Sequence, residues 1–184
     1  MILIPETELN LRAACALIKT DRVNSEEVTD CVALLTFIDE WSWTGRRDGD
    51  EAELNAVLDL RRRVDAIWDG ADDETQTVCR VNALLYDTNA VPWLARHPEM
   101  PAWHLHLTSY GDSLARRMGA EIAMAIADLI RAGELRRLKA CAAPDCRAAV
   151  IDLSRNRCRM FCGTGNCGNR QHVAAYRERR TKAR

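Results

Sequence analysis

The sequence lacks the features that mark membrane proteins, secreted proteins and several common enzyme classes. It holds no apolar run near the about 18 residues that a membrane-spanning helix needs. The apolar start at residues 1–4 has no basic segment before it and no cleavage site after it, so we expect no secretory signal. The hydrolase nucleophile elbow, the P-loop, the dinucleotide fingerprint and the zinc-protease motif are also missing. We therefore expect a cytoplasmic protein that is neither an enzyme nor a membrane protein.

The sequence also has almost no net charge: its 26 Lys and Arg and 27 Asp and Glu give a formal charge of −1. So small a total argues against a nucleic-acid binder, but the charges are unevenly placed. Residues 1–130 hold 12 basic and 23 acidic side chains, a balance of −11, whereas residues 131–184 hold 14 and 4, a balance of +10. The chain is thus an acidic body with a basic tail, and a tail of this charge attracts DNA.

Apolar residues recur at helical spacing through most of the acidic body. This spacing predicts helices over residues 7–20, 25–42, 50–68, 73–86 and 113–132. Asn24 lies three residues before Glu27, a capping-box spacing that places the start of the second helix at Ser25. Asp50 and Glu53 have the same spacing at the start of the third helix.

Between residues 89 and 108 the pattern changes, and prolines separate two segments that we predict as a strand pair, 91–95 and 103–108. His104 and His106 would share one face of the second strand. We expect this face to be the solvent side, with Trp103, Leu105 and Leu107 toward the core. The alternative is that the two histidines form a metal-binding or catalytic pair. A separate hypothesis is a ligand-sensing pocket in the body for a small-molecule effector. Its candidate lining residues are Trp93, Trp103, His104 and His106.

Cysteine is abundant, with eight residues, and five of them fall between residues 141 and 167. Two C-x4-C pairs separated by fifteen residues supply the four thiolates of a tetrahedral zinc site. The predicted ligands are Cys141, Cys146, Cys162 and Cys167. Four thiolates leave no open coordination position, so the expected zinc is structural.

Several alternatives to this ligand set are open on spacing alone. Cys158 would replace Cys162 in a looser pair, or act as a reactive neighbour in a redox switch. His172 would enter the coordination sphere, and four thiolates also suit an iron–sulfur cluster. The stretch between the two cysteine pairs contains Arg147 to Leu153 and a polar turn at Ser154-Arg155-Asn156, and we expect it to form a small hairpin. A helix is expected from Arg170 to about residue 182.

The segments Cys141-Ala-Ala-Pro-Asp-Cys146 and Cys167-Gly-Asn-Arg170 resemble the CGNR zinc finger, as do Asp152 and Ser154-Arg155-Asn156. In a bacterial family of stress-induced transcription regulators this finger follows an N-terminal body called the ABATE domain. The layout of helices and strands here is similar to that body. The resemblance implies one structural zinc ion and a role in transcription. Three positions depart from the family without removing a ligand: Arg157 replaces a small residue, Phe161 a common Trp and His172 a frequent Lys.

The basic charge around the cysteines predicts that the finger binds DNA, because guanidinium groups on a helix suit phosphate contacts and guanine readout. Arg170, Gln171 and His172 are the candidates for base contacts. One finger covers a small footprint, so we expect a homodimer on paired half-sites. The candidate DNA-binding residues are Arg155, Arg157, Arg159, Arg170, Gln171, His172, Arg177, Arg179 and Arg180.

Other functions and arrangements stay open for the basic tail. One alternative is an adaptor, in which zinc builds only a scaffold and the arginines bind acidic protein or RNA. The tail would otherwise be a solvated end, or it would dock on the acidic body, which would mask it until a ligand or DNA competed.

The fold class that we predict is α+β. A predominantly helical body with a small strand pair spans residues 1–133, and a C-terminal treble-clef-like zinc finger with a basic helix spans residues 134–184.

Overall fold

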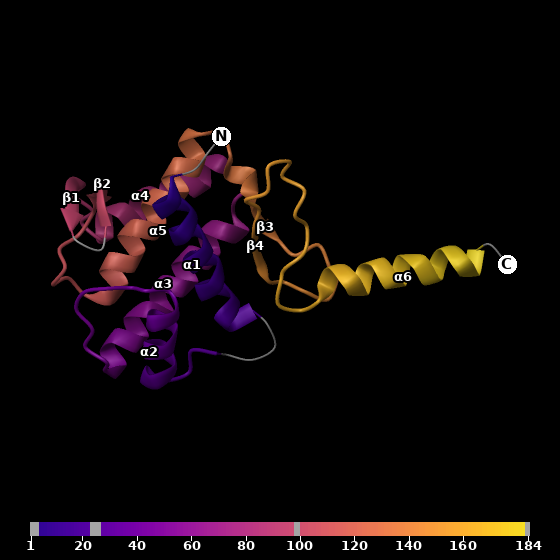
Figure 1. The fold of residues 1–184 in the computed structure, drawn as a ribbon, viewed down its shortest axis with the longest axis horizontal. Helices are drawn as coiled ribbons and strands as arrows, with labels where there is room; N and C mark the ends of the chain where they lie inside the picture. The colour runs from indigo at the N-terminus through magenta and orange to yellow at the C-terminus, as the bar shows by residue number, and fades with distance from the viewer. Residues whose placement is uncertain (1–3, 23–26, 98–99, 183–184) are drawn as a thin grey trace.

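The computed structural model describes residues 4–22, 27–97 and 100–182 (Figure 1). This part of the chain forms a helical body, two small antiparallel strand pairs and one projecting helix, which confirms the predicted α+β class. The elements are α1 (Pro5–Arg22), α2 (Cys31–Glu40), α3 (Glu51–Asp69), α4 (Glu74–Asp87), β1 (Trp93–His97), β2 (Met100–His106), α5 (Leu114–Arg131), the 3-10 turn η1 (Leu135–Arg137), β3 (Leu138–Ala140), β4 (Ala149–Ile151) and α6 (Cys167–Lys182).

Side-chain caps explain where the central helices begin. The Asp50 carboxylate accepts a hydrogen bond from the Glu53 backbone nitrogen at 2.8 Å. The Glu53 carboxylate in turn accepts from the backbone nitrogens of Asp48 and Gly49. Asp73 caps α4 in the same way. These caps satisfy donors that the first turn of a helix leaves unpaired, so α3 and α4 begin where the sequence predicts.

The second helix begins later than predicted. Its N-cap is Asp30, whose carboxylate accepts from the Ala33 backbone nitrogen at 2.8 Å, and α2 starts at Cys31. The predicted start at Ser25 is therefore wrong, because a cap nearer the apolar run holds the first turn. Asn24 and Ser25 themselves lie outside the described residues.

The core of the body is built around α5. Its residues Leu114, Met118, Ile122 and Ile126 are fully buried and recur every four positions, which places them on one side of the helix. They pack against α1, α3 and α4, the helices that surround α5 in Figure 1. At Gly119 an added Cβ would lie only 3.0–3.2 Å from Thr88 and Leu60, so glycine allows these elements to approach closely.

The β1–β2 hairpin stands at the side of the body away from α6 (Figure 1). Its orientation is the reverse of the predicted one, since Trp103 is 64% and Leu105 51% exposed, whereas His104 and His106 are half-buried. The histidine face points toward α5, where the charge of His104 acts on the Glu121 carboxyl. Of the three residues expected to face the core, Leu107, just beyond β2, is buried.

The β3–β4 pair connects the body to the cysteine-rich segment. Leu138, Ala149 and Ile151 join the same apolar core as the helices. Two hydrogen bonds also cross the junction, from Trp68 Nε1 to the Lys139 carbonyl at 2.9 Å and from Cys15 Sγ to the Ala149 carbonyl at 3.3 Å. The hairpin expected between the cysteine pairs, with its turn at residues 154–156, is wrong: β4 pairs with β3, upstream of Cys141, and the described residues after β4 hold no strand. The packing is thus continuous across the predicted division at residue 133.

Helix α6 extends away from the rest of the molecule (Figure 1). It begins at Cys167, three residues before the predicted start. Most of its side chains are exposed, including those of Val173 and Tyr176. In this arrangement the acidic body does not cover α6, contrary to the masking hypothesis.

Candidate metal centre and nucleic-acid interface

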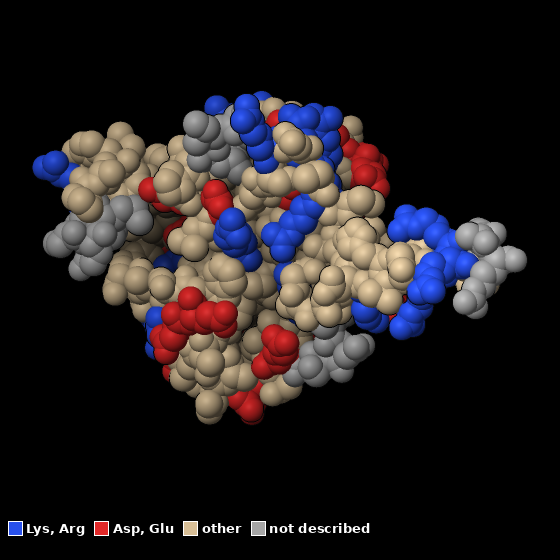
Figure 2. All heavy atoms as spheres, turned by 45° about the vertical axis from the view of Figure 1, so that its right-hand side comes forward, with Lys and Arg blue, Asp and Glu red and all other residues tan. Residues whose placement is uncertain are grey.

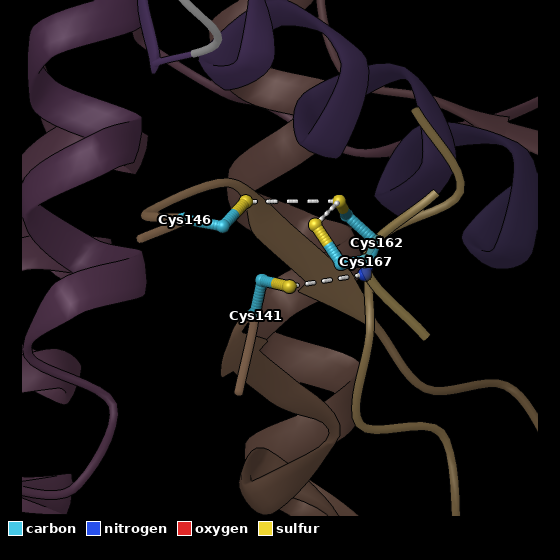
Figure 3. Close-up of side chains that lie close together, drawn as sticks. All are labelled: Cys141, Cys146, Cys162 and Cys167. Atoms are coloured by element: carbon cyan, nitrogen blue, oxygen red, sulfur yellow. Dashed lines mark hydrogen bonds between the residues drawn. The ribbon is translucent and has the colours of Figure 1, made fainter. Parts of the chain in front are cut away.

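Four cysteine side chains converge between β3, β4 and the start of α6 (Figure 3). Cys141 follows β3, Cys146 lies in the turn that leads to β4, Cys162 lies in the following loop and Cys167 opens α6. Their sulfur atoms all lie within 4.8 Å of one another. The sequence pattern thus identifies a real cluster.

The cluster has the dimensions of a tetrahedral zinc site. Zn–S bonds of about 2.3 Å place the sulfurs of a tetrahedron about 3.8 Å apart. The Sγ–Sγ distances are 3.7 Å between Cys146 and Cys162 and 3.6 Å between Cys162 and Cys167. Cys158 and His172 are not part of the cluster: Cys158 is exposed, and the His172 ring lies edge-on to Phe161.

The cysteines of the cluster differ in what their surroundings do to the thiol pKa. The Cys162 backbone nitrogen donates to Cys141 Sγ at 3.4 Å. Burial opposes ionisation of Cys162 itself, but hydrogen bonds from the Gly165 backbone and the Thr164 side chain outweigh it and lower the pKa of this thiol to about 6. Burial raises the pKa of Cys146 to about 12, so this thiol depends on the metal for its deprotonation.

Arg170 bridges the two halves of the site. Its guanidinium donates to Cys167 Sγ at 3.4 Å and to the two carboxylate oxygens of Asp145 at 2.8 and 3.4 Å. Asp145 belongs to the first cysteine pair and Cys167 to the second. Arg170 therefore supports the metal ligands in the way that outer-shell partners orient a metal site, and its predicted contact with DNA stays a prediction.

The comparisons with known families agree with this geometry. The family model described as "Putative stress-induced transcription regulator", ABATE, matches residues 11–133, and the CGNR zinc finger model matches residues 137–180. The chain belongs to the ABATE family. The four cysteines are the zinc site of its CGNR finger, which holds one structural zinc ion. No curated protein matches the chain. The predicted resemblance to both parts of this family is confirmed.

Replacing Arg170 by Ala is expected to weaken zinc binding by the CGNR finger about 10- to 100-fold, because this is the usual cost of removing an outer-shell partner. Competition with a chromophoric chelator measures the change. Arg170→Lys should retain part of the affinity through the ion pair with Asp145. Arg179→Ala removes the same charge from α6 without touching the site. A loss of zinc affinity as large in Arg179→Ala would contradict the bridging role.

Asp152 is the buried polar centre of the ABATE–CGNR junction. Its carboxylate accepts from Lys139 Nζ at 2.6 Å, Ser154 Oγ at 2.5 Å and the Arg159 backbone nitrogen at 2.9 Å. Burial disfavours the charged form, but these hydrogen bonds outweigh it and lower the pKa of Asp152 to about 2. The carboxylate therefore fixes the loop that carries Arg159 and leads to Cys162.

Replacing Asp152 by Asn should destabilise the protein by roughly 3 kcal/mol, since the Lys139 ammonium loses a buried charged partner. Urea unfolding at neutral pH measures this loss. Asp59→Asn, which changes an exposed carboxylate of α3 paired with Arg62 on the surface, should cost less than about 1 kcal/mol. An equal loss of unfolding free energy in the two variants would show that burial of the Asp152 carboxylate does not contribute to stability.

The basic residues of the CGNR loop are divided between structural contacts and solvent. Arg157 donates to Glu134 at 2.6 Å, and Glu134 also accepts from the buried Arg137 at 3.0 Å. Arg157 has a φ of 54°, in the left-handed region that residues other than glycine rarely adopt. Arg155 and Arg159 are both exposed, and Arg159 also borders a hollow between α1 and the finger loop.

The remaining predicted DNA-binding residues lie on α6. Figure 2 shows Lys and Arg side chains gathered along this projecting helix and acidic ones over the lower part of the body. Arg177, Arg179 and Arg180 are exposed, and Arg180 lies over the Tyr176 ring at 5.9 Å. Gln171 is half-buried and His172 exposed, near the base of the helix.

The candidate pocket residues of the ABATE body lie on the hairpin at the far side from the finger. Trp93 is exposed, Trp103 packs under the Arg96 guanidinium at 4.9 Å, and the ring nitrogens Nε2 of His104 and His106 are 3.0 Å apart. A role for this hairpin in sensing a ligand stays a prediction. Among the described residues, no helix combines the length and apolar character needed to span a membrane.

Proposed function

We propose that this ABATE–CGNR chain is a zinc-dependent, DNA-binding transcription regulator in which α6 contacts DNA. The observation that carries the proposal is a 16-residue basic helix that begins at a zinc ligand and projects from the body. Zinc fixes the first residue of α6, so the direction of the helix is set by the metal site. A rigidly mounted helix with exposed arginines suits the DNA major groove.

The dimensions and charge of α6 support this proposal. Sixteen residues at 1.5 Å each give a helix about 24 Å long, enough to lie in a groove about 12 Å wide. Arg177 and Arg180 share one side of the helix, whereas Arg179 lies on another, so the three guanidiniums reach phosphates on both sides of the groove. Arg170 holds the base of the helix through Cys167 and Asp145 and stays a candidate for base contacts.

The proposal extends to the body and to the assembly on DNA. One helix reads few base pairs, so we propose that two chains bind paired half-sites as a homodimer and that the acidic body dimerises or senses a ligand. A regulator of this kind would work in the bacterial cytoplasm during a stress response. These parts rest on the family description and on the footprint of a single helix.

An adaptor that binds protein is the competing function, and one observation favours it. Val173 and Tyr176 are exposed and lie one helical turn apart on α6, which gives the helix an apolar strip beside its arginines. A helix with both features can lay its apolar side in the groove of a protein partner. The two functions therefore use different sides of α6: the arginines would contact DNA, whereas the apolar strip would contact a protein partner.

Zinc-loaded full-length protein is expected to retain random duplex DNA at about 50 mM salt and to lose it steeply as salt rises, because phosphate contacts release counterions. Gel retardation across a salt series measures this, and sedimentation of the complex counts the chains per duplex. Zinc-stripped protein is the control and should lose retention. Retention that does not depend on zinc, or binding of RNA with equal affinity under these conditions, would favour the adaptor.

A further inference from the structure

A small hollow of about 140 Å³ lies where the ABATE body meets the CGNR finger. One wall is the side of α1 that carries Cys15 and Lys19, and the opposite wall is the finger loop that carries Arg159 and the zinc ligand Cys162. Trp41, at the end of α2, completes the lining. Body and finger therefore both contribute to one cavity, which borders the zinc site at Cys162 and is not lined by α6 residues.

The charge of this hollow is of one sign. Arg12, Lys19 and Arg159 line it, and the described residues that line it include no Asp or Glu. Arg12 is paired with Glu8 at 2.6 Å, so Lys19 and Arg159 supply most of the positive charge. Both act on the buried Cys15 thiol, where they oppose the rise in pKa that burial causes. Lys19 and Arg159, from opposite walls of the hollow, therefore both lie close enough to Cys15 for their charges to act on it.

The remaining lining is apolar or aromatic. Trp41, Ile151 and Ala16 border the same space as the two cations. A cavity of about 150 Å³ holds a molecule of the size of benzene. The hollow therefore matches a compact ligand with a planar apolar body and one negative group, and it is too small for a nucleotide or for a typical drug-sized ligand.

We propose that this hollow binds a small aromatic carboxylate, whose anionic group lies between Lys19 and Arg159 and whose ring lies against Trp41. A ligand held by both walls ties the finger loop to α1. The bound state therefore protects the loop that carries Cys162 and slows the loss of zinc. Neither statement depends on DNA binding, so the proposed function and this inference are tested separately.

Calorimetric titration of the zinc-loaded full chain with benzoate tests the binding. Benzyl alcohol, which has the same ring without the charge, is expected to bind at least about tenfold more weakly, because hydrogen bonds to charged groups are the strong ones. Arg159→Met and Lys19→Met keep most of the side-chain volume and should each weaken benzoate binding about tenfold. Arg155→Met removes an exposed arginine of the same loop and should leave the affinity unchanged.

Zinc content and circular dichroism establish that each variant is folded before it is titrated. Benzoate binding that is equal in the native chain and in both Met variants would overturn the proposal. So would benzyl alcohol binding as tightly as benzoate, or an absence of benzoate binding by the folded native chain. Binding of inorganic phosphate without any binding of benzoate would overturn the aromatic part of the assignment.

Zinc transfer to a chelator tests the coupling between the hollow and the finger. Saturating benzoate should slow the transfer several-fold in the native chain and have no effect in Arg159→Met. An equal slowing in both proteins would show that benzoate acts elsewhere.

Discussion

Replacing Cys162 by Ser is expected to release the zinc ion and unfold the finger, the largest single effect that we predict. Zinc binding contributes roughly 10–16 kcal/mol in isolated finger peptides, and three thiolates hold the ion far less tightly than four. Helix α6 has few contacts beyond the site, and an isolated helix of this length is marginal in water. Circular dichroism should therefore lose the signal of its 16 residues together with the metal.

Cys158→Ser is the matched control for this prediction. Cys158 is exposed in the same loop and contacts Ser154 rather than the cluster. Its replacement should leave both zinc content and helix signal unchanged. Equal loss of metal from the two variants would sink the ligand assignment. The body should stay folded in either case, with a lower melting temperature in Cys162→Ser because the β3–β4 pair belongs to its core.

Replacing Arg177, Arg179 and Arg180 together by Gln is expected to lower DNA affinity about 100-fold or more at about 0.1 M salt. Three phosphate contacts would be lost, and each contributes about 0.9 to the slope of log affinity against log salt. The slope should therefore fall by about 2 to 3. Gln keeps a long side chain with good helix propensity, so α6 itself should persist. Fluorescence anisotropy with a labelled duplex measures both quantities.

A triple substitution on the body controls for net charge. Arg62, Arg63 and Arg131 make only surface ion pairs, with Asp59, Asp87 and Asp128, and their replacement by Gln removes the same charge. This variant should bind DNA as the native chain does. If the two triple variants lose DNA affinity equally, the overall charge of the protein rather than α6 accounts for binding.

The parts of the structure that could be predicted rest on local chemistry. Asp50 and Asp73 cap helices that bury one side, so spacing and capping residues together place α3 and α4. The four cysteines were identifiable because zinc needs thiolates at short, repeated spacing whatever surrounds them. Asp30 was missed as the cap of α2 because Asn24 offers equivalent capping chemistry a few residues earlier.

The parts that could not be predicted depend on contacts between distant residues. The strand partner of β4 lies before Cys141, and only the packing against α1 and α3 decides this pairing. The alternation of apolar residues and histidines along Trp103–Leu107 shows that the two faces of the strand differ. It does not show which face lies toward α5. Arginine is a residue type typical of DNA contacts, so the sequence predicts only that role for Arg170. Its support of the metal site depends on a hydrogen bond to Asp145, 25 residues earlier in the chain.

The continuous packing beneath the β3–β4 pair restricts how such chains can be recombined. A chimera that joins this body to another finger at residue 133 would bring in foreign equivalents of Leu138, Ala149 and Ile151. Cys141 and Cys146 lie between those strands, so a junction placed after β4 would leave the first cysteine pair behind. Fingers should therefore be exchangeable only between bodies whose α1 and α3 surfaces match, and in this family DNA preference should be inherited together with the body rather than shuffled independently of it.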